Sequence, residues 1–244
     1  KNPSNITVGI CQQNKDESES CIPDNFKYQN QLRIKKYDYQ DALGPTYARY
    51  ICSHLWDGEE FFLQIDSHSR CVPDWDQKLL DMYKLCPSNK AILTHYPPSH
   101  GQYDKILENK VTPTYTCNAH FENNFHIISE AKHIGKNKDN SKPFRTPYAS
   151  AGLLFGRSDF LNEVPFDPYL PYLFQGEEIL LSARLWTNGW DLFNLNDSVI
   201  THYYNREKDN QPHFWDDHGH KSWHKVQKES NKRYYYILEQ LGES

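Results

Sequence analysis

The chain has 244 residues, of which 37% are hydrophobic and 14% aromatic, enough for a folded domain with a sizeable core. Its 27 basic and 32 acidic residues give a net charge of −5, which excludes the basic footprint of a nucleic-acid-binding protein. The longest apolar runs span only a few residues, so the sequence predicts no membrane-spanning segment.

The first quarter of the chain mixes strand and helix signals. Residues 6–10 and 31–35 alternate apolar with small or polar side chains, which predicts two strands. A Gly-Pro pair then opens a segment with apolar residues at helical spacing, which predicts a helix over 45–56. The nearly continuous apolar run over 60–66 predicts a buried strand that ends in polar residues.

The alternation continues with a helix predicted over 75–86 and a strand over 91–94. Strands that alternate with helices over residues 6–95 predict an α/β fold with a mainly parallel central sheet. Residues 96–148 are rich in proline and predict loops with one or two antiparallel strands.

The last third predicts two helices and a hairpin. A helix begins at Glu177-Glu178 and stops at Asn188-Gly189. Residues 190–195 and 199–203 predict a C-terminal β-hairpin, and residues 223–241 a final helix. No internal repeat or linker interrupts the sequence, so we expect residues 1–244 to form a single domain.

The six cysteines are never at CxxC spacing, which argues against a zinc ribbon or a thioredoxin-like redox pair. We expect most of them to be small core residues. Cys11 and Cys21 flank a polar loop and are candidates for a disulfide in an oxidising compartment.

A carboxylate and an imidazole follow the strand predicted over 60–66. Asp66 and His68 are two residues apart, and side chains at that spacing in a strand point the same way. The pair suits Mn²⁺ or a similar divalent ion, which would neutralise the phosphates of a nucleotide diphosphate. The alternative is that Asp66 caps the following turn and His68 is a surface residue.

The segment from Gln64 to Arg70, with the Pro-x-Trp-Asp sequence that follows, resembles the DxD-like motif of glycosyltransferase family 60, the polypeptide α-N-acetylglucosaminyltransferases. The resemblance covers about residues 6–206. Further motifs occur in the family's order: Gly44-Pro45-x-x-Ala48-Arg49, Ala151-Gly152 with Phe155, Val164-Pro165-x-Asp167-Pro168, Phe174-x-Gly176-Glu177-Glu178 and His202-x-Tyr204-x-Arg206.

The resemblance implies a GT-A fold, a Rossmann-like sheet that binds a UDP-sugar at its strand ends. It implies that Asp66, His68 and His202 ligate Mn²⁺ or Mg²⁺, and that Asp66 binds the donor through this ion. Phosphate oxygens and water would complete an octahedral site. On its own, His202 would be interpreted as a hydrogen-bonded strand residue.

Further candidate residues follow from the same motifs. Arg49, near a helix start, and Arg206, after a strand, are candidates for binding the ribose or the diphosphate through charge-assisted hydrogen bonds. Gly152 would let the backbone approach the sugar. Glu177 and Glu178 are the candidate catalytic acids, one of which would bind GlcNAc hydroxyls or orient the acceptor hydroxyl. The alternative is that the pair only complements the helix dipole.

The activity that the resemblance implies is a metal-dependent, retaining transfer of GlcNAc from UDP-GlcNAc to a protein hydroxyl, either hydroxyproline or Thr/Ser. One alternative is a GT-A transferase of another sugar, GalNAc or galactose. The other is a non-catalytic carbohydrate-binding remnant, because the family's first strand, expected before Val8, is not found. The cysteine pattern favours the cytoplasm, and the Golgi lumen is the alternative if an anchor lies upstream.

Overall fold

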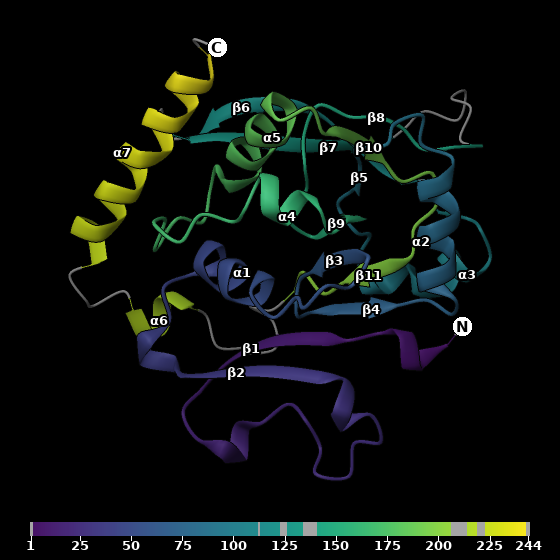
Figure 1. The fold of residues 1–244 in the computed structure, drawn as a ribbon, viewed down its shortest axis with the longest axis horizontal. Coiled ribbons are helices and arrows are strands. Elements are labelled where there is room, and N and C mark those ends of the chain that lie inside the picture. Colours follow the sequence, from purple (N-terminus) through teal and green to yellow (C-terminus); the bar gives the residue numbers. More distant parts are fainter. Residues whose placement is uncertain are drawn as a thin grey trace. The chain divides into compact units, whose positions relative to one another are not determined.

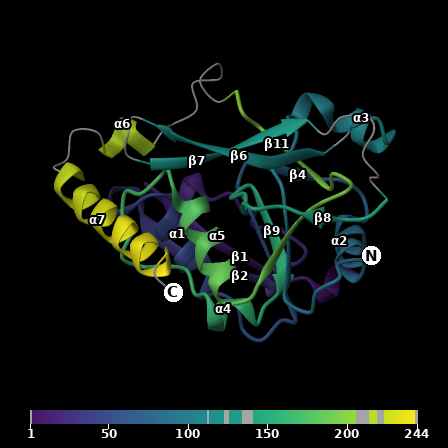
Figure 2. The same cartoon turned by 90° about the horizontal axis from the view of Figure 1, so that it is seen from above.

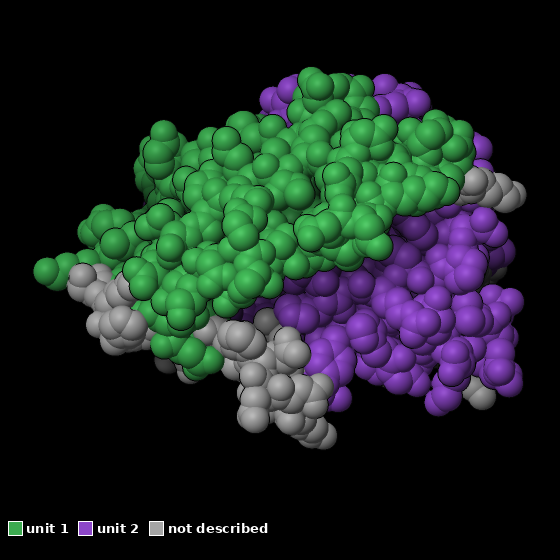
Figure 3. Space-filling model, turned by 90° about the horizontal axis from the view of Figure 1, so that it is seen from below, with its two compact units in different colours: residues 1–59, 165–174, 212–236 green, residues 60–164, 175–211, 237–244 purple. Residues whose placement is uncertain are grey.

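The computed structural model describes residues 2–111, 113–122, 126–133, 141–205, 214–218 and 223–242. Its contacts divide the chain into two compact units, coloured separately in Figure 3. Unit 1 comprises residues 1–59, 165–174 and 212–236, and unit 2 comprises residues 60–164, 175–211 and 237–244. Each unit draws segments from distant parts of the sequence, so no single cut along the chain separates them.

Unit 1 contains a two-stranded parallel sheet, β1 (Val8–Asn14) and β2 (Leu32–Asp38), whose register runs from Val8 opposite Leu32 to Asn14 opposite Asp38 (Figure 1). Both predicted strands are confirmed and are longer at their C-terminal ends. Short 3-10 turns flank them: η1 (Pro3–Asn5), η2 (Glu17–Glu19), η3 (Gln29–Gln31) and η4 (Tyr39–Asp41).

Helix α1 (Pro45–Ser53) confirms the helix predicted over 45–56, and it ends three residues earlier. Gly44 precedes it with a φ of 95°, a left-handed conformation that favours glycine, and proline occupies the first turn. The segment 165–174 is tied to this helix, because Thr46 Oγ1 donates to the Leu173 carbonyl oxygen at 2.8 Å.

The other helices of unit 1 are α6 (Phe214–His218) and most of α7 (Trp223–Gly242). The final helix predicted over 223–241 is therefore confirmed. Ser230 Oγ, buried on α7, donates to the Pro171 carbonyl oxygen at 2.7 Å and fastens the helix to the segment 165–174. None of the described helices combines the length and apolar character needed to span a membrane.

Unit 2 is built on a five-stranded sheet in the order β3-β9-β5-β10-β8. The strands are β3 (Phe61–Ile65), β9 (Leu153–Arg157), β5 (Ala91–Thr94), β10 (Asp191–Asn194) and β8 (Phe144–Arg145). Among the four neighbouring pairs of this described sheet, only β5 and β10 are parallel, so the prediction of a mainly parallel sheet is wrong. The reason is that β9 enters between β3 and β5 and runs against both.

The predicted C-terminal hairpin is also wrong. β10 pairs with β5 and β8, while β11 (Ile200–His202) pairs antiparallel with β4 (Ser69–Cys71). Between these strands, Leu195 and Val199 are both fully buried. Burial of these side chains stabilises a connection that crosses the core, whereas a tight exposed turn would leave them in water.

The remaining strands of unit 2 form an antiparallel pair, β6 (Thr114–Glu122) and β7 (His126–His133), which confirms the antiparallel strands predicted within 96–148 (Figure 2). Helix α5 (Glu177–Thr187) packs against β7 and β10 and confirms the helix predicted to begin at Glu177. The other helical segments are α2 (Trp75–Lys84), η5 (His100–Gln102), α3 (Tyr103–Leu107) and α4 (Phe160–Glu163).

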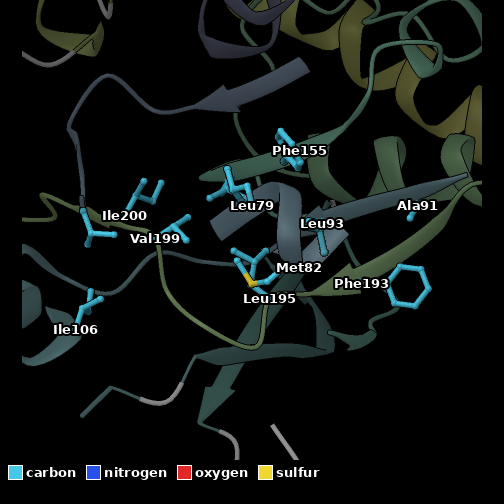
Figure 4. Close-up of a cluster of buried hydrophobic side chains, with 12 residues drawn as sticks. Leu79, Met82, Ala91, Leu93, Ile106, Phe155, Phe193, Leu195, Val199 and Ile200 are labelled. Carbon is cyan, nitrogen blue, oxygen red and sulfur yellow. The ribbon is translucent and has the colours of Figure 1, made fainter. Parts of the chain in front are cut away.

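The core of unit 2 lies between the sheet and α2, with contributions from the segment around β11 (Figure 4). Its buried side chains are Val72, Leu79, Met82, Ala91, Leu93, Ile106, Leu153, Phe155, Phe193, Leu195, Val199 and Ile200. The helix predicted over 75–86 is therefore confirmed as α2, and its regularly spaced apolar side chains are the ones that pack against the sheet.

Gly156 allows β9 to lie against β5. A Cβ atom at this position would lie 2.5 Å from Ile92 Cδ1 and 2.9 Å from the Ala91 carbonyl oxygen, both in the fully buried strand β5. We therefore expect Gly156→Ala to lower the free energy of unfolding by about 1–3 kcal/mol through overpacking, measured by urea denaturation. Gly101→Ala is the matched control, because its Cβ would meet only Ser99 Oγ, at 4.0 Å. Equal losses in the two variants would contradict this account of β9.

Candidate functional site

The predicted metal residues lie at the ends of two short paired strands in unit 2. β3 ends at Ile65, and residues 66–68 turn the chain into β4. β4 pairs with β11 so that His202 lies opposite Ser69, and the Tyr203 amide donates to the His68 carbonyl oxygen at 2.9 Å. This backbone ladder brings His202, more than 130 residues away in the sequence, beside the Asp66–His68 turn.

The side chains of this turn and of β11 face one another. His202 Nε2 lies 3.7 Å from Asp66 Oδ2, and the ring centroids of His68 and His202 are 6.0 Å apart. His68 Nδ1 lies 3.1 Å from Ser67 Oγ. In the tautomer whose Nδ1–H donates to that oxygen, Nε2 of His68 carries the lone pair and is the atom through which this residue would bind a metal ion.

Asp66, His68 and His202 have the donor types that a Mn²⁺ site uses, one carboxylate and two imidazoles. The His202 side chain is 11% exposed and the Asp66 side chain 35%. Within the described residues, no group of three or more His, Cys, Asp or Glu side chains is placed so that it could hold a metal ion. Asp66, His68 and His202 thus match a divalent ion in donor type, but they do not form a ligand set in this arrangement.

His202 is held from a second side by the segment after β5. Its backbone amide donates to the Pro98 carbonyl oxygen at 2.9 Å, and its ring packs 4.4 Å from the ring of Tyr204. The Tyr204 hydroxyl donates to the Pro97 carbonyl oxygen at 2.7 Å. Burial, followed by the negative charges of Asp66 and Glu178, raises the pKa of Tyr204 to about 12, so this phenol stays protonated at neutral pH.

The Glu178 carboxylate accepts hydrogen bonds from three segments of unit 2. Its Oε1 accepts the Ala151 amide at 2.7 Å, and its Oε2 accepts Ser129 Oγ at 3.1 Å and the Tyr96 hydroxyl. Burial raises the pKa of Glu178, and the hydrogen-bond donors act in the opposite direction. Burial and the Glu178 charge also raise the pKa of Tyr96, so the phenol keeps its proton and donates a hydrogen bond to the carboxylate.

Gly152 lies where the turn before β9 meets the segment after β5. A Cβ atom on Gly152 would lie 2.7 Å from Pro97 Cδ, so only glycine fits without moving that proline. The neighbouring Ala151 amide is the one that Glu178 holds. The predicted residues Asp66, Gly152, Glu178 and His202 are thus linked through Pro97, Pro98 and Tyr204 in one part of unit 2.

The other predicted residues are placed as follows. Glu177 begins α5 beside Glu178. Arg49 lies on α1 in unit 1, and Arg206 lies outside the described residues.

Sequence reasoning missed Tyr96 and Ser129, and it treated Tyr204 only as part of a motif. The proline pair after β5 is the one local signal for a specifically shaped segment, because proline fixes φ and removes an amide donor. Ser129 has no local signal, since its partner Glu178 is 49 residues away.

Comparison with known proteins gives one family match. A family model described as glycosyltransferase (GlcNAc) matches residues 23–243. A search of curated proteins finds no match.

Solved structures show the fold. A crystal structure of GalNAc-T7 with UDP, GalNAc and Mn²⁺ superposes with a TM-score of 0.59 at 15% sequence identity. The match covers 82% of this chain and 38% of that one, so the chain spans well under half of the solved protein's length. The fold is GT-A, as the sequence motifs predict.

The Glu178 network gives a stability prediction. Tyr96→Phe removes a donor to a buried carboxylate and should lower the free energy of unfolding by about 1.5–3 kcal/mol. Tyr204→Phe is the matched control, because it removes a hydrogen bond to a neutral carbonyl and should cost about 0.5–1.5 kcal/mol. Both are measured by urea denaturation, and a larger loss for Tyr204→Phe would show that Glu178 is not the stronger acceptor.

His95, the residue after β5, makes the protein sensitive to acid. It is fully buried, and neither ring nitrogen has a hydrogen-bond partner among the described residues. Burial lowers the pKa of His95 from 6.5 to about 4. As the pH falls, the unfolded chain therefore takes up this proton before the folded chain does. Protonation of His95 does not affect the free energy of unfolding above pH 6.5, and it lowers that free energy progressively as the pH falls towards about 4.

We expect wild type to lose about 3 kcal/mol of unfolding free energy between these pH values relative to His95→Phe, which cannot titrate. Denaturation of both proteins across that range measures the difference. Parallel pH profiles for the two proteins would rule out His95 as the source.

Proposed function

The chain belongs to the glycosyltransferase (GlcNAc) family, and we propose that it transfers GlcNAc from UDP-GlcNAc to a protein hydroxyl, as the resemblance to glycosyltransferase family 60 implies. The acceptor would be hydroxyproline, Thr or Ser, and the reaction would retain the anomeric configuration. The observation that carries the proposal is the approach of His202 Nε2 to Asp66 Oδ2, 3.7 Å, at the strand ends of a GT-A unit.

The proposed cofactor is Mn²⁺, or Mg²⁺, held by Asp66, His68 and His202. Their mixed oxygen and nitrogen donors support the assignment, and the GalNAc-T7 structure of the same fold was determined with Mn²⁺. Such an ion supplies charge neutralisation of the departing diphosphate.

The chain's own residues would orient the donor around this site. His202 is fixed by the β4–β11 ladder, and Asp66 lies in the short turn that leads from β3 into β4, which limits the rearrangement needed on binding. Gly152 lets its turn pack against Pro97 beside this site, and the approach of its backbone to the sugar stays a prediction. Glu178, already engaged by three donors, positions the Ala151–Gly152 turn, and Glu177 is the acid that would contact sugar or acceptor hydroxyls.

A transferase of GalNAc is the second candidate, because the GalNAc-T7 structure was solved with UDP and GalNAc. The two candidates share the same metal residues. They are separated by comparing UDP release from UDP-GlcNAc and from UDP-GalNAc in the presence of Mn²⁺.

The test of the proposed site is Asp66→Asn, which keeps the shape of the side chain and removes its charge. We expect kcat/KM for UDP-GlcNAc turnover to fall at least ~100-fold. The reason is that losing the Asp66 charge would weaken the binding of an ion whose neutralisation of the leaving group is worth several kcal/mol. Mn²⁺ binding, followed by electron paramagnetic resonance, should weaken in parallel.

Asp81→Asn is the matched control, since Asp81 lies on α2 with its side chain 60% exposed. Undiminished Mn²⁺ binding and turnover in Asp66→Asn would reject the site. Absence of turnover with any UDP-sugar in the wild-type chain would leave the carbohydrate-binding alternative as the better account.

A further inference from the structure

One face of the β1–β2 sheet in unit 1 is covered by α1. A Cβ atom on Gly9 would lie 3.0 Å from Leu55 Cβ, just beyond the end of that helix. Arg33, which is in register with Gly9, donates from Nη1 to the Leu55 carbonyl oxygen at 2.7 Å. These contacts show which face of the sheet meets the helix and which part of α1 lies over Gly9.

The same geometry brings two cysteines together. Cys11 is two residues beyond Gly9 and points to the same face, while Cys52 is three residues before Leu55 and lies one turn back along the helix. The Cys52 carbonyl oxygen would lie 3.7 Å from the same Cβ atom on Gly9, so the turn of α1 that carries Cys52 lies against this part of β1. The Cys11 and Cys52 side chains interact there, and each shifts the pKa of the other. Both residues are partly exposed, so a small reagent can reach them.

The surroundings make the two thiols unequal. The interaction with Cys11 and the charge of Arg49, one turn away on α1, lower the pKa of Cys52, against the opposing effect of burial. The interaction with Cys52, together with burial, raises the pKa of Cys11. Cys52 is therefore the nucleophile of the pair and Cys11 the thiol that keeps its proton.

We propose that Cys11 and Cys52 form a reversible dithiol–disulfide couple, a redox modification site that links β1 to α1. The oxidant class is a low-molecular-weight disulfide such as oxidised glutathione. This site uses none of the residues assigned to the metal, and it shares only Arg49 with the candidate donor-binding residues.

The chemistry proceeds by two thiol–disulfide exchanges. The Cys52 thiolate attacks one sulfur of the small disulfide, forming a mixed disulfide and releasing one small thiolate. Cys11 then loses its proton to solvent and attacks the Cys52 sulfur, which forms the Cys11–Cys52 bond and releases the second small thiolate. The cysteine pair gives up two electrons, and the small disulfide is reduced to two thiols.

The other cysteines differ from this pair. Burial raises the pKa of Cys71, and it raises the pKa of Cys86 to about 12, so both are poor nucleophiles at neutral pH. Cys21, which the polar loop suggested as the partner of Cys11, is exposed. The structure thus favours Cys52 over Cys21 as the partner of Cys11, because the strand directs Cys11 towards the helix.

The experiment is oxidation of the folded wild-type chain with excess oxidised glutathione near neutral pH, followed by alkylation and mass spectrometry. We expect Cys11 and Cys52 to be lost as free thiols without a glutathione retained on either, and a peptide containing Cys11 to be joined to one containing Cys52. Before oxidation, Cys52 should be alkylated more than tenfold faster than Cys86, as its larger thiolate fraction requires.

Cys11→Ser should retain one glutathione on Cys52, because the resolving thiol is missing, and Cys21→Ser should behave as wild type. Linkage of Cys11 to Cys21, a stable glutathione adduct on Cys52 of the wild-type chain, or Cys11 and Cys52 thiols that both remain alkylatable would each overturn the proposal. If a variant does not fold, the peptide map of the wild-type chain decides alone.

Discussion

The arrangement of the candidate site depends on one buried carboxylate. Glu178 brings a negative charge into the interior of unit 2, and such a charge is stable there only with several donors around it. The donors come from the segment after β5, from β7 and from the turn before β9. Satisfying Glu178 therefore fixes these segments against α5, and the carbonyl groups of Pro97 and Pro98 then hold Tyr204 and His202. The need of one carboxylate for hydrogen-bond donors thus determines where the residues of the site lie.

The sequence predicts the elements of the fold better than their pairing. Local apolar spacing predicts β3, β5, α2 and α5 to within a few residues, because a buried face requires apolar residues at regular intervals. The direction of β9 does not affect such spacing. It depends on close backbone approach at Gly156, which brings together residues more than 60 positions apart. For the same reason the hairpin predicted near residue 200 gave way to two separate long-range pairings.

The candidate site shows the same division. Asp66 and His68 are recognisable because their chemistry and spacing are local, and the family resemblance added His202 and Gly152. Tyr96 and Ser129 could not be found, since each acts through a partner distant in the sequence. Cys11 illustrates the point in unit 1, where the nearest cysteine along the chain is Cys21 but the cysteine whose side chain interacts with it is Cys52.

If Asp66 and His202 lay on flexible loops, their close approach would indicate no more than an ordinary ion pair. Here His202 is the last residue of β11, and Asp66 follows β3 directly and enters a turn whose far end is paired with β11. Side chains alternate along a strand, so a slip of one residue in the β4–β11 register would turn His202 away and present Tyr203. Ile200, two residues earlier on the same face, and Thr201 on the other face are both fully buried, so the same slip would place a threonine at the position that the isoleucine fills. Core packing and site geometry therefore select the same register.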